Sequence, residues 1–248
     1  MEFRFLHLYP DLMSLYGSYA NVSVLVRQLE LLGHSVHLET VAPGDTASLS
    51  GADFLFLGAG TERSQAAALE ALSSMAGDIR SAAGDGLPML FAGTAMELLG
   101  ASVTGRDGQC RKGLEVASFT AVQGDKRIVG DLYGTTDLYD EPVVGFMNKC
   151  AVISGVETPL ITACAMGFGN EREGGPEGFH RDNVFASELT GPLLVKNPGM
   201  LRAVTAAVCA RCGVTLPEEL PHLPYLQEGF QVTAEQLRLR CEATKTMV

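Results

Sequence analysis

Two glycine-containing turns hold the residues best placed to do chemistry. Gly58-Ala59-Gly60 follows the apolar segment Asp53–Leu57, and Gly93-Thr94-Ala95 follows the apolar segment Leu87–Ala92. A glycine turn after a strand lets backbone N–H groups approach a ligand or an oxyanion, although a plain tight turn has the same composition. In many α/β enzymes the nucleophile lies on a sharp turn between a strand and a helix, like the turn at Gly93-Thr94-Ala95. Here that turn offers no obvious nucleophile.

Three further groups are weaker candidates. Arg127 begins an apolar segment and could clamp a carboxylate through paired hydrogen bonds, unless it is simply an exposed strand-end arginine. His180 lies in a glycine-rich loop, where a histidine is usually just solvated. Cys209-x-x-Cys212 is half of a zinc site, but no second pair stands at a useful spacing. We therefore expect no metal and no cofactor.

Composition narrows the classes of partner. The 248 residues are 46% hydrophobic and 19% charged, as in an ordinary soluble protein, and the net charge is −11. An acidic chain repels phosphate backbones and anionic lipid, so we expect no nucleic-acid partner and no membrane insertion. No leader or membrane-spanning segment is evident. Six scattered cysteines indicate reduced thiols and a cytoplasmic location: Cys110, Cys150, Cys164, Cys209, Cys212 and Cys241.

The first half of the chain alternates apolar strand patterns with helical ones. Predicted strands are Phe3–Tyr9, Ser35–Val41, Asp53–Leu57 and Leu87–Ala92. Predicted helices are Val22–Leu32, Glu62–Ala83 and Thr94–Leu99, after a loop over Leu12–Asn21. This alternation predicts an α/β fold with a doubly wound, mainly parallel sheet. Ligands bind beyond the carboxyl ends of such strands, where the turn after Tyr9 and the two glycine turns should meet.

The second half is richer in strands and should extend that sheet or pack a second one against it. Predicted strands are Val116–Val122, Arg127–Tyr133, Val143–Phe146, Leu160–Met166 and Val184–Leu189. A helix is predicted over Pro198–Val214, followed by an irregular segment, Thr215–Gly229. Thr233 and Gln236 resemble a capping box that opens a terminal helix. We expect one domain over residues 1–214, with residues 215–248 as a tail and helix packed on it.

Several motifs, in order, resemble class I glutamine amidotransferases of the cobyric acid synthase type. The similarity spans residues 5–212, and the nearest branch is the glutaminase subunit of lipid II isoglutaminyl synthase. The motifs are L-H-L-Y-P-D-L-M-S-L-Y-G (Leu6–Gly17), F-L-G-A-G-T-E-R-S-Q (Phe56–Gln65), A-G-T-A-M-E-L-L-G (Ala92–Gly100), K-R-I-V-G-D-L (Lys126–Leu132), V-V-G-F-M-N (Val143–Asn148) and G-P-L-L-V-K-N-P (Gly191–Pro198). The resemblance implies a flavodoxin-like core and a substrate site that includes Arg127, Gly58 and Gly60.

The departures from this family bear on activity. The family places its nucleophilic cysteine where this chain has Gly93, and its catalytic histidine where this chain has Thr190. The family's glutamine in the same motif corresponds to Glu97. Glutamine hydrolysis by the family mechanism needs a thiolate and a base. The comparison therefore implies a catalytically degenerate glutaminase.

Three functions remain open from the sequence. The first is a degenerate glutaminase subunit that forms a heterodimer with a Mur-ligase-like, ATP-dependent amidating subunit in cell-wall precursor amidation, with glutamine as a candidate ligand. The second is a hydrolase with a relocated nucleophile or base, drawn from Thr94, Glu97, His180 or Cys150. The third is a binding module for an amino-acid carboxylate, held by the Gly58 turn and Arg127.

Overall fold

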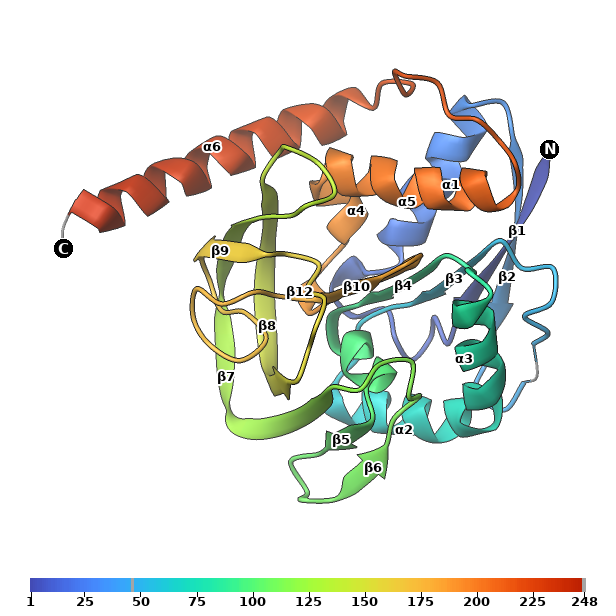
Figure 1. Ribbon diagram of the computed structural model, residues 1–248, viewed down its shortest axis with the longest axis horizontal. Coiled ribbons are helices and arrows are strands. Elements are labelled where there is room, and N and C mark those ends of the chain that lie inside the picture. Colours follow the sequence, from blue (N-terminus) through green and yellow to red (C-terminus); the bar gives the residue numbers. More distant parts are fainter. Residues whose placement is uncertain (46, 247–248) are drawn as a thin grey trace.

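A mainly parallel sheet forms the centre of the molecule. The computed structural model describes residues 1–45 and 47–246. In the order β10-β11-β4-β3-β1-β2, every neighbouring pair is parallel except β10 and β11 (Figure 1). The strands are β1 (Glu2–Leu8), β2 (Ser35–Val41), β3 (Phe54–Leu57), β4 (Met89–Ala92), β10 (Phe179–Arg181) and β11 (Val184–Ser187). This confirms the predicted α/β fold class.

Helices cover both faces of this sheet. On one face, α2 (Glu62–Leu72) and α3 (Ala76–Gly84) pack on Leu6 and Leu8 of β1 and on their neighbours. On the other face, α1 (Ala20–Leu31) and α5 (Pro198–Arg211) pack on Phe3 and Phe5. β1, β3 and β4 are buried on both faces and therefore read as apolar runs, which is why the sequence pattern located them. The prediction of a loop around His180 was wrong, because Phe179–Arg181 form the short edge strand β10.

The strands of the second half build a second, mixed sheet. Its order is β12-β8-β7-β5-β6, and β9 pairs with β7. These strands are β5 (Ser102–Thr104), β6 (Cys110–Lys112), β7 (Thr120–Thr135), β8 (Val143–Ser154), β9 (Ala163–Met166) and β12 (Leu189–Thr190). Ala121 of β7 and Ile153 of β8 are buried in the apolar core that also contains side chains of α2 and α3. The second sheet therefore packs beside the first.

Several predicted boundaries were wrong, in both halves of the chain. Residues 116–122 and 127–133 contribute to one strand, β7, because the polar residues between them form an irregularity in the pairing with β8 and not a turn. Residues 184–189 divide between the two sheets at Glu188. The helix predicted over residues 62–83 is interrupted by a 3-10 turn, η2 (Ser73–Met75).

The prediction for the C-terminal helix was also wrong at its start. Helix α6 (Pro224–Thr246) begins nine positions before Thr233, whose hydroxyl donates to the carbonyl of Gly229 (2.7 Å) inside the helix. Proline favours the first turn of a helix because its missing N–H is not needed there. Phe230 and Leu237 pack on Val144 of β8, while the end of α6 extends away from the body (Figure 1). No helix within residues 1–45 and 47–246 is both long and apolar enough to cross a membrane.

Candidate functional site

The turn after β3 has its backbone donors already in use. The N–H of Ala59 donates to the hydroxyl of Ser18 (3.1 Å), and the N–H of Gly60 donates to the hydroxyl of Thr94 (2.9 Å). An added Cβ at Gly58 or Gly60 would stand 2.4 Å from atoms of the loop after β1, so close packing alone requires both glycines. An oxyanion at this turn would have to displace hydroxyls that hold these two N–H groups.

The turn after β4 has the sharp geometry of a nucleophile turn without a nucleophile. Gly93 has φ +63° and begins η3 (Gly93–Leu99), which is a buried 3-10 helix and not the predicted α-helix. An added Cβ at Gly93 would lie 2.6 Å from the Cβ of Ala59, closer than such atoms approach one another. The methyl group of Ala59 therefore fills the space that any side chain at position 93 would need.

Thr94 links the two turns through hydrogen bonds. Its hydroxyl donates to the carbonyl of Gly60 (3.0 Å) while it accepts from the N–H of the same residue. Its own carbonyl accepts from the side-chain amide of Gln65 (2.7 Å). The side chain is buried and bonded on both sides, which leaves its oxygen poorly placed to attack a substrate.

A buried network of amides and a carboxyl group continues from this turn. The amide of Gln123 on β7 donates to the carbonyl oxygen of Gln65 (2.6 Å) and to Oε2 of Glu97 (2.9 Å). Burial, reinforced by the charge of Glu188, raises the pKa of Glu97 to about 8, although both amides oppose the shift. At neutral pH Glu97 is therefore mainly a neutral acid, similar in shape to a glutamine.

A buried ion pair lies behind this network. The ammonium group of Lys149 on β8 pairs with Glu188 and donates to the carbonyl of Gly169 (2.9 Å). Glu177 accepts from the N–H of Glu188 (2.7 Å) and from the hydroxyl of Ser187 (2.8 Å). Burial raises the pKa of Glu177 to about 7 and also raises the pKa of Glu188, while Lys149 opposes both shifts. This cluster fixes the point at which the chain passes from β11 to β12.

Thr190 follows this cluster, and none of the residues that the structure describes is bonded to its hydroxyl in a way that could make it a base. It pairs with Phe146 across β12 and β8, and its hydroxyl donates to the carbonyl of Phe146 (2.9 Å). A threonine hydroxyl held in this way cannot take a proton from a nucleophile near neutral pH. Its role in the structure is to close the pairing between β12 and β8.

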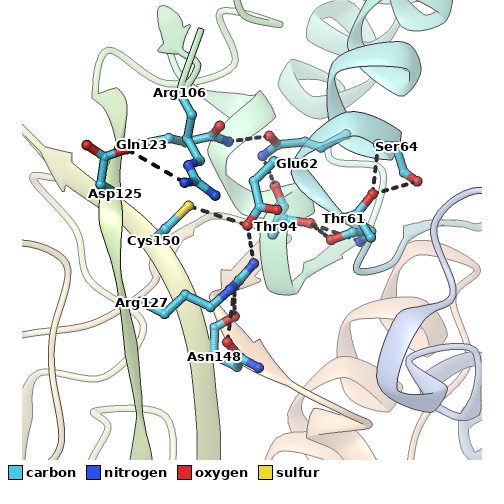
Figure 2. Close-up of polar contacts among 12 residues, drawn as sticks. Thr61, Glu62, Ser64, Thr94, Arg106, Gln123, Asp125, Arg127, Asn148 and Cys150 are labelled. Atoms are coloured by element: carbon cyan, nitrogen blue, oxygen red, sulfur yellow. Dashed lines mark hydrogen bonds and ion pairs between the residues drawn. The ribbon is translucent and has the colours of Figure 1, made fainter. Parts of the chain in front are cut away.

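The sequence predicted that Arg127 could bind a substrate carboxylate, but its guanidinium group is already paired with a carboxylate of the protein. Its guanidinium group forms an ion pair with Glu62, the first residue of α2, and donates to the side-chain oxygen of Asn148 (3.1 Å). Figure 2 shows Glu62 between Arg127 and Cys150, so all three side chains converge there. Asn148 in turn donates to the hydroxyl of Tyr16 (2.8 Å).

The remaining candidate nucleophiles and ligands do not join this group in an active form. The thiol of Cys150 donates to Glu62 (3.4 Å), and burial together with Glu62 raises the pKa of Cys150 to about 12. His180 lies on the edge strand β10 against the ring of Phe185 (4.7 Å between centroids). The thiol of Cys212 donates to Asp53 (3.1 Å). Among the described residues, no three histidine, cysteine or acidic side chains are placed to hold a metal ion.

Sequence reasoning missed the three residues of the buried charge cluster. Lys149, Glu177 and Glu188 come from β8, from the segment before β10 and from the link between β11 and β12, so no local spacing unites them. One signal was present, because Lys149 and Glu188 each interrupt a mostly apolar segment, residues 143–153 and 184–189. Charged residues are almost never fully buried without a partner, so two such interruptions indicate a pair.

A family model for the CobB/CobQ-like glutamine amidotransferase domain matches residues 4–198. The chain belongs to this family. That confirms the resemblance inferred from the motifs. The glutamine amidotransferase chain is similar to the lipid II isoglutaminyl synthase (glutamine-hydrolyzing) subunit GatD of Staphylococcus aureus strain N315, with 26% identity over 91% of this chain and 93% of the relative. It is 31% identical to the GatD subunit of Streptococcus pneumoniae strain R6, over 84% of this chain and 81% of that one.

Solved structures give the same fold. A crystal structure of a glutamine amidotransferase matches with a TM-score of 0.53 and 14% identity, over 82% of this chain and 98% of that one. A glutamine amidotransferase from Thermotoga maritima matches with a TM-score of 0.52 and 12% identity, over 95% of both chains. At these identities the likeness establishes the amidotransferase fold alone, so the chemistry of this chain rests on its own residues.

Proposed function

We propose that this chain is a catalytically degenerate glutaminase subunit. In this proposal it pairs with a Mur-ligase-like, ATP-dependent amidating subunit, and the heterodimer amidates a lipid II-type cell-wall precursor in the cytoplasm. The similarity to two GatD subunits over most of their length supports the choice of system. The observation that carries the loss of activity is the turn at Gly93, where the methyl group of Ala59 fills the side-chain space.

The chemistry of glutamine hydrolysis explains why this turn matters. The family mechanism forms an acyl-enzyme on a thiolate, which needs a sulfur at the turn and a base beside it. Gly93 supplies no attacking atom, and the hydroxyl of Thr190 is bonded to a backbone carbonyl. The N–H groups of Ala59 and Gly60 are held by hydroxyls, so stabilisation of an oxyanion is weakened as well.

Binding of a substrate at Arg127, Gly58 and Gly60 stays a proposal. The carboxylate of Glu62 occupies the guanidinium group of Arg127 in the way a substrate carboxylate would. Glutamine could bind there only after Glu62 turned away. This competition argues against the amino-acid binding module as the main function.

The hydrolase with a relocated nucleophile has less support. Thr94 is bonded through its hydroxyl on both sides, and the thiol of Cys150 is protonated near neutral pH because its pKa is about 12. Glu97 is a buried neutral acid that is bonded to Gln123. The ring of His180 lies on β10, the edge strand of the central sheet, against Phe185. It forms no hydrogen bond with Thr94, Glu97 or Cys150, so it does not complete a nucleophile and base pair with them.

Reconstitution with the partner tests the proposal. The chain would be co-expressed with the Mur-ligase-like protein of the same genome, and amidation of lipid II would be followed with ammonium or glutamine as the nitrogen source. We expect a stable complex that amidates with ammonium and not with glutamine. Amidation from glutamine at a comparable rate would contradict the loss of activity. Failure of the two proteins to co-purify would contradict the partner assignment.

A further inference from the structure

A separate cavity of about 290 Å³ lies on the outer side of the buried amide network. Its walls come from α2, from η3, from β7, and from β5 and β6 with the segment that joins them. Leu69, Leu98 and Val103 form an apolar wall, and the amides of Gln65 and Gln123 border it as buried polar groups. An apolar surface with a few buried polar groups is the usual make-up of a small-molecule site, and the volume suits a small metabolite.

The two carboxylates at this cavity are already paired inside the protein. Glu62 forms the ion pair with Arg127 described above. Asp107 receives two hydrogen bonds from Arg111 and one from a backbone N–H, which lower the pKa of Asp107 to about 2. Neither acid is therefore free to neutralise another cation at the cavity.

Two guanidinium groups at the same cavity remain available. Arg63 forms no ion pair or side-chain hydrogen bond with any residue that the structure describes. Arg106 has one long ion pair, 3.6 Å from Asp125, whose side chain is 95% exposed (Figure 2). An exposed pair of this kind contributes little free energy, so a ligand can replace Asp125 at small cost.

We propose that this cavity binds a small dicarboxylic acid. Arg63 and Arg106 each receive one carboxylate, since a guanidinium group matches a carboxylate with two parallel hydrogen bonds. The carbon chain of the acid lies on the wall formed by Leu69, Leu98 and Val103. In a chain with a net charge of −11, two cations without close partners beside an apolar wall select for an anion. The inference goes beyond the proposed function and does not depend on the turn at Gly93.

Calorimetric titration of the full chain with glutarate tests this proposal. We expect saturable binding, and we expect Arg63→Gln and Arg106→Gln each to weaken it about tenfold or more, because each removes a charge-assisted pair. Arg27→Gln is the matched control, since Arg27 is 60% exposed on α1 and does not line the cavity; it should bind as the parent does. Butyrate, with one carboxylate, should bind more weakly than glutarate.

Three results would overturn the proposal. The first is the absence of glutarate binding at millimolar concentration to a chain whose thermal unfolding shows that it is folded. The second is binding that Arg63→Gln and Arg106→Gln leave unchanged while Arg127→Gln removes it, which would place the ligand on the face of the Arg127 group. The third is equal affinity for butyrate and glutarate, which would remove the requirement for two carboxylates.

Discussion

Replacing Glu97 by glutamine should stabilise the protein, and the gain should grow with pH. Glu97 is 1% exposed and its pKa rises from an ordinary 4.5 to about 8 through burial. Between these two values the native state holds a proton that the unfolded state has released, so stability falls as the pH rises through this window. The cost is about 1.4 kcal/mol for each pH unit above 4.5, or about 3 kcal/mol at pH 7. Glutamine carries no proton to lose, so Glu97→Gln removes this cost.

Urea denaturation of the parent and the variant at pH 5, 6, 7 and 8 measures the effect. The difference in unfolding free energy should be small at pH 5 and reach about 3 kcal/mol by pH 7. Glu171→Gln removes an exposed carboxyl group and should show no such trend. A difference that stays constant from pH 5 to pH 8, or a variant that is less stable at pH 8, would refute the assignment of Glu97 as a buried neutral acid.

Three further sets of substitutions test the packing of the protein, each by urea denaturation at pH 7. Gly93→Cys should lower the unfolding free energy because the new side chain meets the methyl group of Ala59. Adding Ala59→Gly should recover about 1–3 kcal/mol of the loss. No recovery would show that the methyl group is not the obstacle. Lys149→Met should lower the unfolding free energy by about 3–5 kcal/mol because it leaves Glu188 buried without a cation. Adding Glu188→Leu should reverse much of this loss. Losses that add up in the double variant would contradict the pairing. Asn197→Ala removes three hydrogen bonds to buried backbone groups and should cost at least about 2 kcal/mol, and a change under 0.5 kcal/mol would mean that water replaces the side chain.

The sequence located the central sheet well because its strands are short, apolar on both faces and bounded by glycine turns. The segments around β1, β3 and β4 stand out for this reason, and the motifs identified the family correctly. The placement of Gly93 on a sharp turn after a strand also follows from the local pattern. The division of the chain at residue 214 stays a prediction.

Features that depend on segments far apart in the chain could not be predicted from local pattern. The contact between Ala59 and an added side chain at position 93 joins two turns that are separated by a whole helix pair. The ion pair of Glu62 and Arg127 depends on how the second sheet packs beside the first. The start of α6 was misplaced because a proline and acidic residues resemble an irregular segment until tertiary contacts at Phe230 and Leu237 stabilise the helix.

Ammonia release from L-glutamine is the measurement that tests the central claim most directly. The purified chain would be assayed alone and in complex with its amidating partner, beside a Gly93→Cys, Thr190→His variant built in an Ala59→Gly background. We predict no release above the buffer blank for the natural chain, alone or paired. Release that stays in constant proportion to the natural chain through successive purification steps would contradict the account, because it would require a nucleophile other than one at position 93.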